Sequence, residues 1–110
     1  GENHPVVARD WATLAGIYCS LEKFDVSITY YQKAIDSNVI TYGSSHIALA
    51  HKHNNIANVY NKAKRSDKVV EHLSDSYQIF LDILGENHPD TIFVSENLNT
   101  AIESKVNELH

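Results

Sequence analysis

The pentapeptide GENHP at residues 1–5 returns unchanged at residues 85–89, which is 84 positions later. Midway between the two copies, residues 43–47 read GSSHI, a degenerate form of the same motif, so the underlying period is 42 residues. Apolar positions repeat at the same offset, as Leu14 and Ile56 illustrate. A fixed period of this length is the sequence signature of a repeat architecture. The chain therefore divides into two full units and a half unit, at residues 1–42, 43–84 and 85–110.

The apolar spacing within each full unit predicts two helices. Apolar side chains at intervals of three and four residues lie on one face of an α-helix, and we expect that face to form the core. In the first unit the two stripes are Val7, Trp11, Leu14 and Tyr18, then Phe24, Ile28, Tyr31 and Ile35. In the second unit they are Ala50, Ile56, Ala57 and Tyr60, then Val69, Val70, Leu73, Tyr77, Phe80 and Leu81.

Proline, serine and glycine indicate where these helices begin and end. Pro5 and Pro89 suit a first helical turn, where the missing N–H of proline would be unpaired in any case. Ser66 is a favourable start for the second helix of unit two, since its hydroxyl can accept from exposed N–H groups. Gly43 and Gly85 follow the second helices, where a residue with positive φ commonly ends a helix.

The half unit predicts one long helix over residues 89–109, because residues 90–109 contain neither glycine nor proline. Polar residues make up most of this segment, as expected for the helix that caps a repeat stack. We therefore predict an all-α, right-handed superhelical stack of five antiparallel helices with a C-terminal capping helix. The apolar members of the last helix are Ile92, Leu98, Ile102, Val106 and Leu109.

Composition narrows the functional class. A chain of 110 residues suits a single domain, and its net charge of -5 disfavours nucleic acid as a partner. Cys19 is the single cysteine, so no internal disulfide forms and a reducing, cytoplasmic setting is expected. No apolar stretch is long enough to cross a bilayer. The first residue is Gly1 and methionine is absent, so we expect a fragment of a longer protein.

The repeat resembles the tetratricopeptide repeat family. The residues that carry the resemblance are Trp11, Leu14, Ala15, Tyr18, Ser27, Tyr31 and Ala34 in unit one, and His53, Ile56, Ala57, Tyr60, Val69, Leu73 and Ser76 in unit two. The 42-residue period, with Gly-x-x-His-Pro opening a unit, looks like the kinesin light chain type. The resemblance implies a scaffold or adaptor that binds other proteins, with a concave groove lined by the first helix of each hairpin. It also places small residues where helices cross closely.

Unit two departs from the family pattern in two places. Val69, Leu73 and Ser76 stand where serine, an aromatic residue and alanine are usual. The turn at Lys64 and Arg65 lacks the usual glycine.

The predicted peptide-binding groove combines the resemblance with helical spacing. On the first helix of unit two, five polar positions share one face. An asparagine amide can pair with both the N–H and the C=O of a peptide backbone, so such a face suits an extended peptide. The alternative interpretation is a merely solvated helix face. The groove residues are Arg9, His51, Asn54, Asn58, Asn61, Lys62, Glu96 and Thr100.

The remaining sequence patterns do not predict a metal site or an active site. His51 and His53 are two positions apart on a helix and point to different sides, so we expect no metal site and no cofactor. No phosphate loop, cysteine pair or nucleophile motif indicates an enzyme. A basic cluster (Lys62, Lys64, Arg65 and Lys68) is interpreted as a solvated turn, with an acidic docking partner as the alternative.

A second function stays open beside peptide binding. Only two and a half repeats are present and the N-terminal end has no polar cap, whereas about three repeats are usually needed for stability. The chain is then a structural element that self-associates through this end or packs on further repeats.

Overall fold

The computed structural model describes residues 5–109, with side chains from Asp10 onward, as five α-helices. No strand occurs among these residues, which confirms the all-α prediction. The helices are α1 (Pro5–Ser20), α2 (Phe24–Tyr42), α3 (Ile47–Lys62), α4 (Ser66–Leu84) and α5 (Pro89–Glu108).

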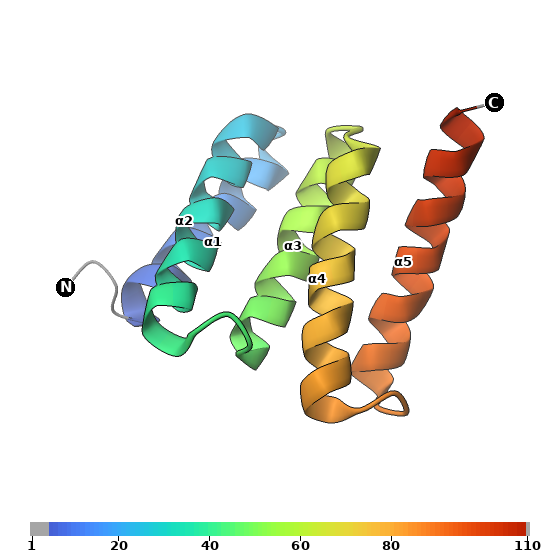
Figure 1. The fold of residues 1–110 in the computed structure, drawn as a ribbon. Helices are drawn as coiled ribbons and strands as arrows, with labels where there is room; N and C mark the ends of the chain where they lie inside the picture. The colour runs from blue at the N-terminus through green and yellow to red at the C-terminus, as the bar shows by residue number, and fades with distance from the viewer. Residues whose placement is uncertain (1–4, 110) are drawn as a thin grey trace.

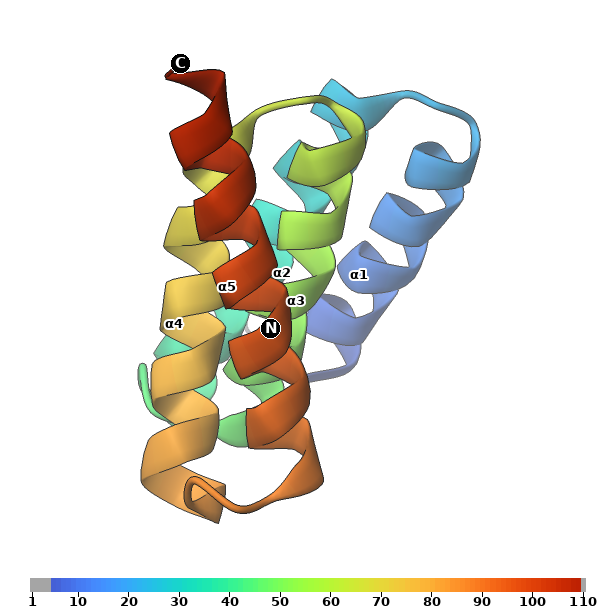
Figure 2. The same ribbon diagram turned by 90° about the vertical axis from the view of Figure 1, so that its right-hand side faces the viewer.

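The helices form a fan of antiparallel hairpins (Figure 1). α1 packs on α2 and α3 packs on α4, while α2 contacts α3 and α5 contacts α4. The side view shows α5 lying across the front of the second hairpin (Figure 2). The Cα trace measures 47 × 34 × 18 Å, so the stack is a thin slab. Every helix therefore has a face that no other described helix covers.

The repeated histidine caps the first helix in the second unit and the single helix of the half unit. The Nδ1 atom of His46 accepts a hydrogen bond from the N–H of Ala48 at 3.1 Å. The Nδ1 atom of His88 accepts from the N–H of Asp90 at the same distance. A side-chain acceptor at this position satisfies an otherwise unpaired N–H of the first turn. His4, the third member of the motif, lies outside the described residues.

Four residues with positive φ shape the turns. Gly43 and Gly85 have φ values of 84° and 86°, and each ends the second helix of its unit as predicted. Glu22 and Lys64 both have φ of 61°, one at each hairpin turn. The left-handed conformation costs a residue with a Cβ about 1–2 kcal/mol. Glu22 and Lys64 are therefore strained at positions where glycine would not be.

Small side chains allow the helices of each hairpin to approach closely. Ala15, Ala34, Ala57 and Ser76 are all at most 1% exposed, as the family resemblance implies. The Ser76 hydroxyl of α4 donates to the carbonyl of Ala50 at 2.8 Å. The Ser27 hydroxyl of α2 likewise donates to the carbonyl of Ala15 at 2.6 Å. These bonds satisfy buried hydroxyls and join the two helices of each hairpin.

The prediction that Leu14 belongs to the core is wrong. Ile56, its counterpart one period later, is fully buried, whereas Leu14 is 39% exposed. α3 has α2 on one side and α4 on the other, whereas α1 packs mainly on α2 among the described helices. The same apolar position is therefore core in unit two and surface in unit one. Val7, the first member of the predicted stripe, has a side chain outside the described set.

Most of the predicted apolar members of the last helix are also exposed. The buried side chains of α5 are Thr91 and Val94, both 1% exposed. These two residues lie on the face that α4 covers, and no described helix covers the opposite face. Among the predicted members Leu98 alone is half-buried, while Ile92, Ile102, Val106 and Leu109 are exposed.

Candidate interaction groove

The polar face of α3 is positioned by the residues that anchor its other side. Ile56, Ala57, Val59 and Tyr60 are buried in the core, which leaves the other side of the helix facing outward. Asn58 is exposed on that outward face, and Asn61 is exposed one turn later.

A first cavity of about 210 Å³ lies between α3, α4 and α5. Asn58 and Asn61 of α3 form one wall, and Thr100 of α5 forms part of the other. Val69 and Leu73 of α4 supply its apolar lining. The cavity therefore combines amide and hydroxyl groups on its sides with aliphatic surface.

A hydrogen bond crosses the same region near the end of α5. The Ser66 hydroxyl donates to Oε2 of Glu108 at 2.6 Å, which ties the start of α4 to the last turn of α5. These two residues are separated by one period of 42 positions.

A second cavity of about 170 Å³ lies at the other end of α5. His51 and Asn54 of α3 line it together with Phe80 of α4 and Phe93 of α5. The His51 ring meets Phe80 edge-on, with centroids 5.2 Å apart. The buried Oδ1 atom of Asn54 has no hydrogen-bond partner among the described residues. A buried acceptor without a partner costs free energy and favours occupation by a donor.

The structure thus divides the predicted groove residues among several places. Asn58, Asn61 and Thr100 meet at the first cavity, and His51 and Asn54 meet at the second. Glu96 is exposed on α5 and lines neither cavity. Lys62 lies at a third cavity, and the side chain of Arg9 is outside the described set.

The third cavity, of about 460 Å³, lies between the two hairpin turns. Lys62, Lys64 and Arg65 face Glu22 and Asp25 across it.

Internal contacts occupy part of the basic cluster. The Arg65 guanidinium lies over the Tyr60 ring at 5.3 Å, and Lys68 Nζ is 3.2 Å from a Glu71 carboxylate oxygen. Two of its four cations therefore have partners within the chain.

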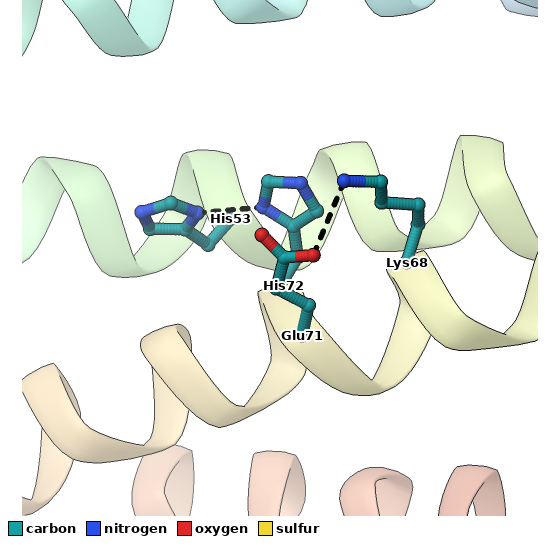
Figure 3. Close-up of polar contacts among 4 residues, drawn as sticks. All are labelled: His53, Lys68, Glu71 and His72. Carbon is teal, nitrogen blue, oxygen red and sulfur yellow. Dashed lines mark hydrogen bonds and ion pairs between the residues drawn. The ribbon is translucent and has the colours of Figure 1, made fainter.

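A histidine pair inside the second hairpin is not apparent from the spacing along either helix. The Nδ1 atoms of His53 on α3 and His72 on α4 are 2.9 Å apart, as the close-up shows (Figure 3). Spacing along α3 relates His53 only to His51, which points to another side of the same helix. The pair could have been predicted from the hairpin itself. Residues at similar distances before and after a turn face each other across antiparallel helices.

Burial changes the titration of both rings in this pair. Desolvation lowers the pKa of His53, and the nearby Asp75 and Glu71 carboxylates oppose that effect. Desolvation also lowers the pKa of His72, helped by His53 and opposed by the same two carboxylates. Both imidazoles are therefore held more strongly in the neutral form than free histidine is.

Comparison with known proteins finds a family model that matches part of the chain and relatives that align with all of it. Residues 12–48 match the tetratricopeptide repeat family model. The whole chain aligns with clustered mitochondria protein homologs, at 26% identity in Xenopus tropicalis and 24% in both Danio rerio and Homo sapiens. The chain spans only 8–9% of the length of these curated relatives.

A solved structure supports the fold over nearly the whole chain. The crystal structure of BtubC (BKLC) from P. vanneervenii superposes with a TM-score of 0.82 over 93% of this chain and 41% of that one. The two sequences are 17% identical, so the likeness concerns the fold.

The match to this repeat has a general functional meaning. Tetratricopeptide repeats mediate protein–protein interactions. None of the described helices is long and apolar enough to span a membrane. The matched residues, the 42-residue period and the helical hairpins together confirm the predicted resemblance to tetratricopeptide repeats of the kinesin light chain type.

Proposed function

We propose that this chain is a non-catalytic interaction module that holds an extended segment of a partner protein between α3 and α5. The observation that carries the proposal is the pair of cavities described above. Both have the polar face of α3 on one side and α5 on the other. We call this combined surface the α3–α5 groove, defined by His51, Asn54, Asn58, Asn61 and Thr100.

The dimensions of the groove suit a short extended segment. His51 and Asn61 are ten residues apart on α3, which corresponds to about 15 Å of helix length. An extended chain advances about 3.3 Å per residue, so about four or five residues reach from one cavity to the other. The amides of Asn54, Asn58 and Asn61 then face successive backbone groups of the segment.

The lining of the two cavities indicates which side chains the segment carries. Val69 and Leu73 offer aliphatic surface in the first cavity, and Phe80 and Phe93 offer aromatic surface in the second. We expect an apolar side chain at each end of the segment. Lys62 follows the polar face at the turn and favours an acidic residue beyond the first cavity.

A peptide-display selection against the chain tests this function. The discriminating variant is Asn54→Ala with Asn58→Ala. A net hydrogen bond contributes about 1 kcal/mol, so loss of two weakens binding of the selected peptides by about thirtyfold. Helicity should persist, because Asn58 is exposed and alanine favours helix more than asparagine does.

Asn55→Ala is the matched control, since Asn55 is an exposed asparagine on the same helix that lines neither cavity. Peptides that bind the double variant and the wild type equally would move the binding site away from the groove.

A second candidate function is assembly through the ends of the stack. The observation that favours it is apolar exposure on both end helices. Ile17 of α1 and Leu21, which directly follows α1, are 52% and 60% exposed, and Ile102 of α5 is 42% exposed. One period earlier, Tyr60 occupies the position of Ile102 and stacks on His72 of α4 at 5.5 Å. Ile102 therefore stands where, one repeat earlier, a residue is covered by the next helix. We infer that a further helix could cover the outer face of α5 in the same way.

Light scattering at increasing protein concentration tests the assembly function. A mass that rises with concentration, and returns to that of a monomer in Ile102→Lys, supports contact through α5. Leu21→Lys probes the α1 end in the same way. A concentration-independent monomer would remove self-association as a function of this chain.

We also propose that the chain is cytoplasmic. Cys19 is a half-buried free thiol, and a reducing compartment keeps it in that form.

A further inference from the structure

Three side chains that could bind a metal ion converge inside the second hairpin, away from the α3–α5 groove. They are His53 on α3 and His72 and Asp75 on α4, and their ligand atoms all lie within 4.8 Å of one another. His72 and Asp75 are three positions apart, so both project from the same face of α4. None of the three lines a cavity of the groove.

The distance between the two imidazoles is compatible with a shared ion. Their Nδ1 atoms are 2.9 Å apart. Two nitrogens at about 2.0–2.1 Å from one ion stand about 2.9 Å apart when the angle at the ion is about 90°, and about 3.3 Å apart in a tetrahedron. A tetrahedral site therefore needs the rings to separate by about 0.4 Å, which side-chain rotation provides.

Ring packing already fixes the orientation of one ligand. His72 stacks on Tyr60 with centroids 5.5 Å apart and planes at 13°. Arg65 covers the Tyr60 ring. A ligand whose ring is held in place loses little conformational freedom when the ion binds.

The local charges favour a cation at this point. Asp75 and Glu71 both act on the two imidazoles as negative charges. Lys68 is the opposing cation, and its Nζ is drawn to Glu71 at 3.2 Å (Figure 3). Asp75 offers a third ligand beside the two imidazoles, and zinc sites use at least three protein ligands.

We propose that His53, His72 and Asp75 form a site for a divalent transition metal ion of the Zn²⁺ class, which joins α3 to α4. Two imidazoles and one carboxylate are the donor set that suits zinc and its neighbours rather than calcium or magnesium. In the metal-free chain one Nδ1–H donates to the other Nδ1. Binding moves that proton to Nε2 of the same ring, so that both Nδ1 lone pairs face the ion. Asp75 is exposed, so water can complete the coordination.

Calorimetric titration with ZnCl₂, together with NMR of the imidazole nitrogens, tests the site. We expect one ion per chain and a shift of the Nδ1 resonances of His53 and His72. Asp75→Asn should weaken zinc binding at least about tenfold. Since Asp75 is exposed, this variant keeps its fold, as circular dichroism would verify. His72→Phe preserves an aromatic ring against Tyr60 but removes the ligand, and should abolish binding.

His88→Asn is the matched control, because it removes a histidine outside the cluster and keeps a side-chain acceptor for the N–H of Asp90. Zinc binding should be unchanged in this control. Equal binding by the wild type, Asp75→Asn and His72→Phe would overturn the site. So would loss in His72→Phe with Asp75→Asn unaffected, or no Nδ1 shift at millimolar zinc.

Discussion

α3 and α5 are the first helices of successive units, yet their surroundings differ. Tyr60 of α3 is 7% exposed, whereas Ile102, one period later on α5, is 42% exposed. α3 lies between α2 and α4, while α5 lies at the end of the fan and packs on α4 (Figure 1). In a repeat stack, each unit buries its apolar surface only against its neighbours. The comparison shows that the number of neighbours, more than the apolar pattern of a helix, decides which side chains become core.

The largest expected effect comes from truncating a buried isoleucine on α3, compared with an exposed isoleucine on α5. Ile56 on α3 is fully buried, so Ile56→Ala should lower the free energy of unfolding by about 2–5 kcal/mol. Ile102→Ala on α5 should lower it by less than about 1 kcal/mol, because much of that side chain is already in water. Urea unfolding of both variants measures the difference. Similar losses would mean that another helix covers α5 in solution.

A second difference is the histidine pair, since α5 carries Ser95 one period after His53. Desolvation lowers the pKa of both His53 and His72 below the ordinary 6.5 of the unfolded chain. The unfolded chain therefore binds protons more readily in mild acid. Stability should be full above pH 6.5 and fall as the pH drops toward the folded-state pKa values.

Urea midpoints measured between pH 7.5 and 5.5, with a chelator present, test this pH dependence. His72→Phe removes one of the two groups and should flatten it. A wild-type midpoint that does not fall on acidification would contradict the neutral, buried pair.

The smallest effect concerns the hairpin turn that follows α3. Lys64 has φ of 61°, a conformation that glycine adopts without steric cost. Lys64→Gly should therefore raise the free energy of unfolding by about 1 kcal/mol, seen as a higher thermal midpoint. Glu22→Gly, at the same φ in the first hairpin, is the matched test. A lower midpoint in Lys64→Gly would show that the lysine side chain stabilises the turn by more than the strain costs.

Part of the proposed α3–α5 groove was predictable from the sequence, and part was not. Helical spacing placed Asn58 and Asn61 on one outward face, and the structure brings both to one cavity with Thr100. It assigned His51 and Asn54 to the same surface, but they lie at a separate cavity beside Phe80. Spacing along one helix orders its side chains but carries no information on where a neighbouring helix leaves space.

The sequence by itself determined the features that depend on local chain chemistry. The 42-residue period, the five helices and the helix ends at Gly43 and Gly85 can all be read from the linear sequence. Hydrogen bonds within a turn of helix and the φ preference of glycine act over a few residues, so a linear sequence displays them.

Tertiary structure alone decided which of these residues are buried and which meet. Leu14 and Ile102 are exposed although their spacing is that of a core, because no described helix covers them. His53 and His72 are 19 positions apart and touch because α3 and α4 pack antiparallel. Burial and contact are properties of the neighbouring helices, and for that physical reason only the packed chain reveals them.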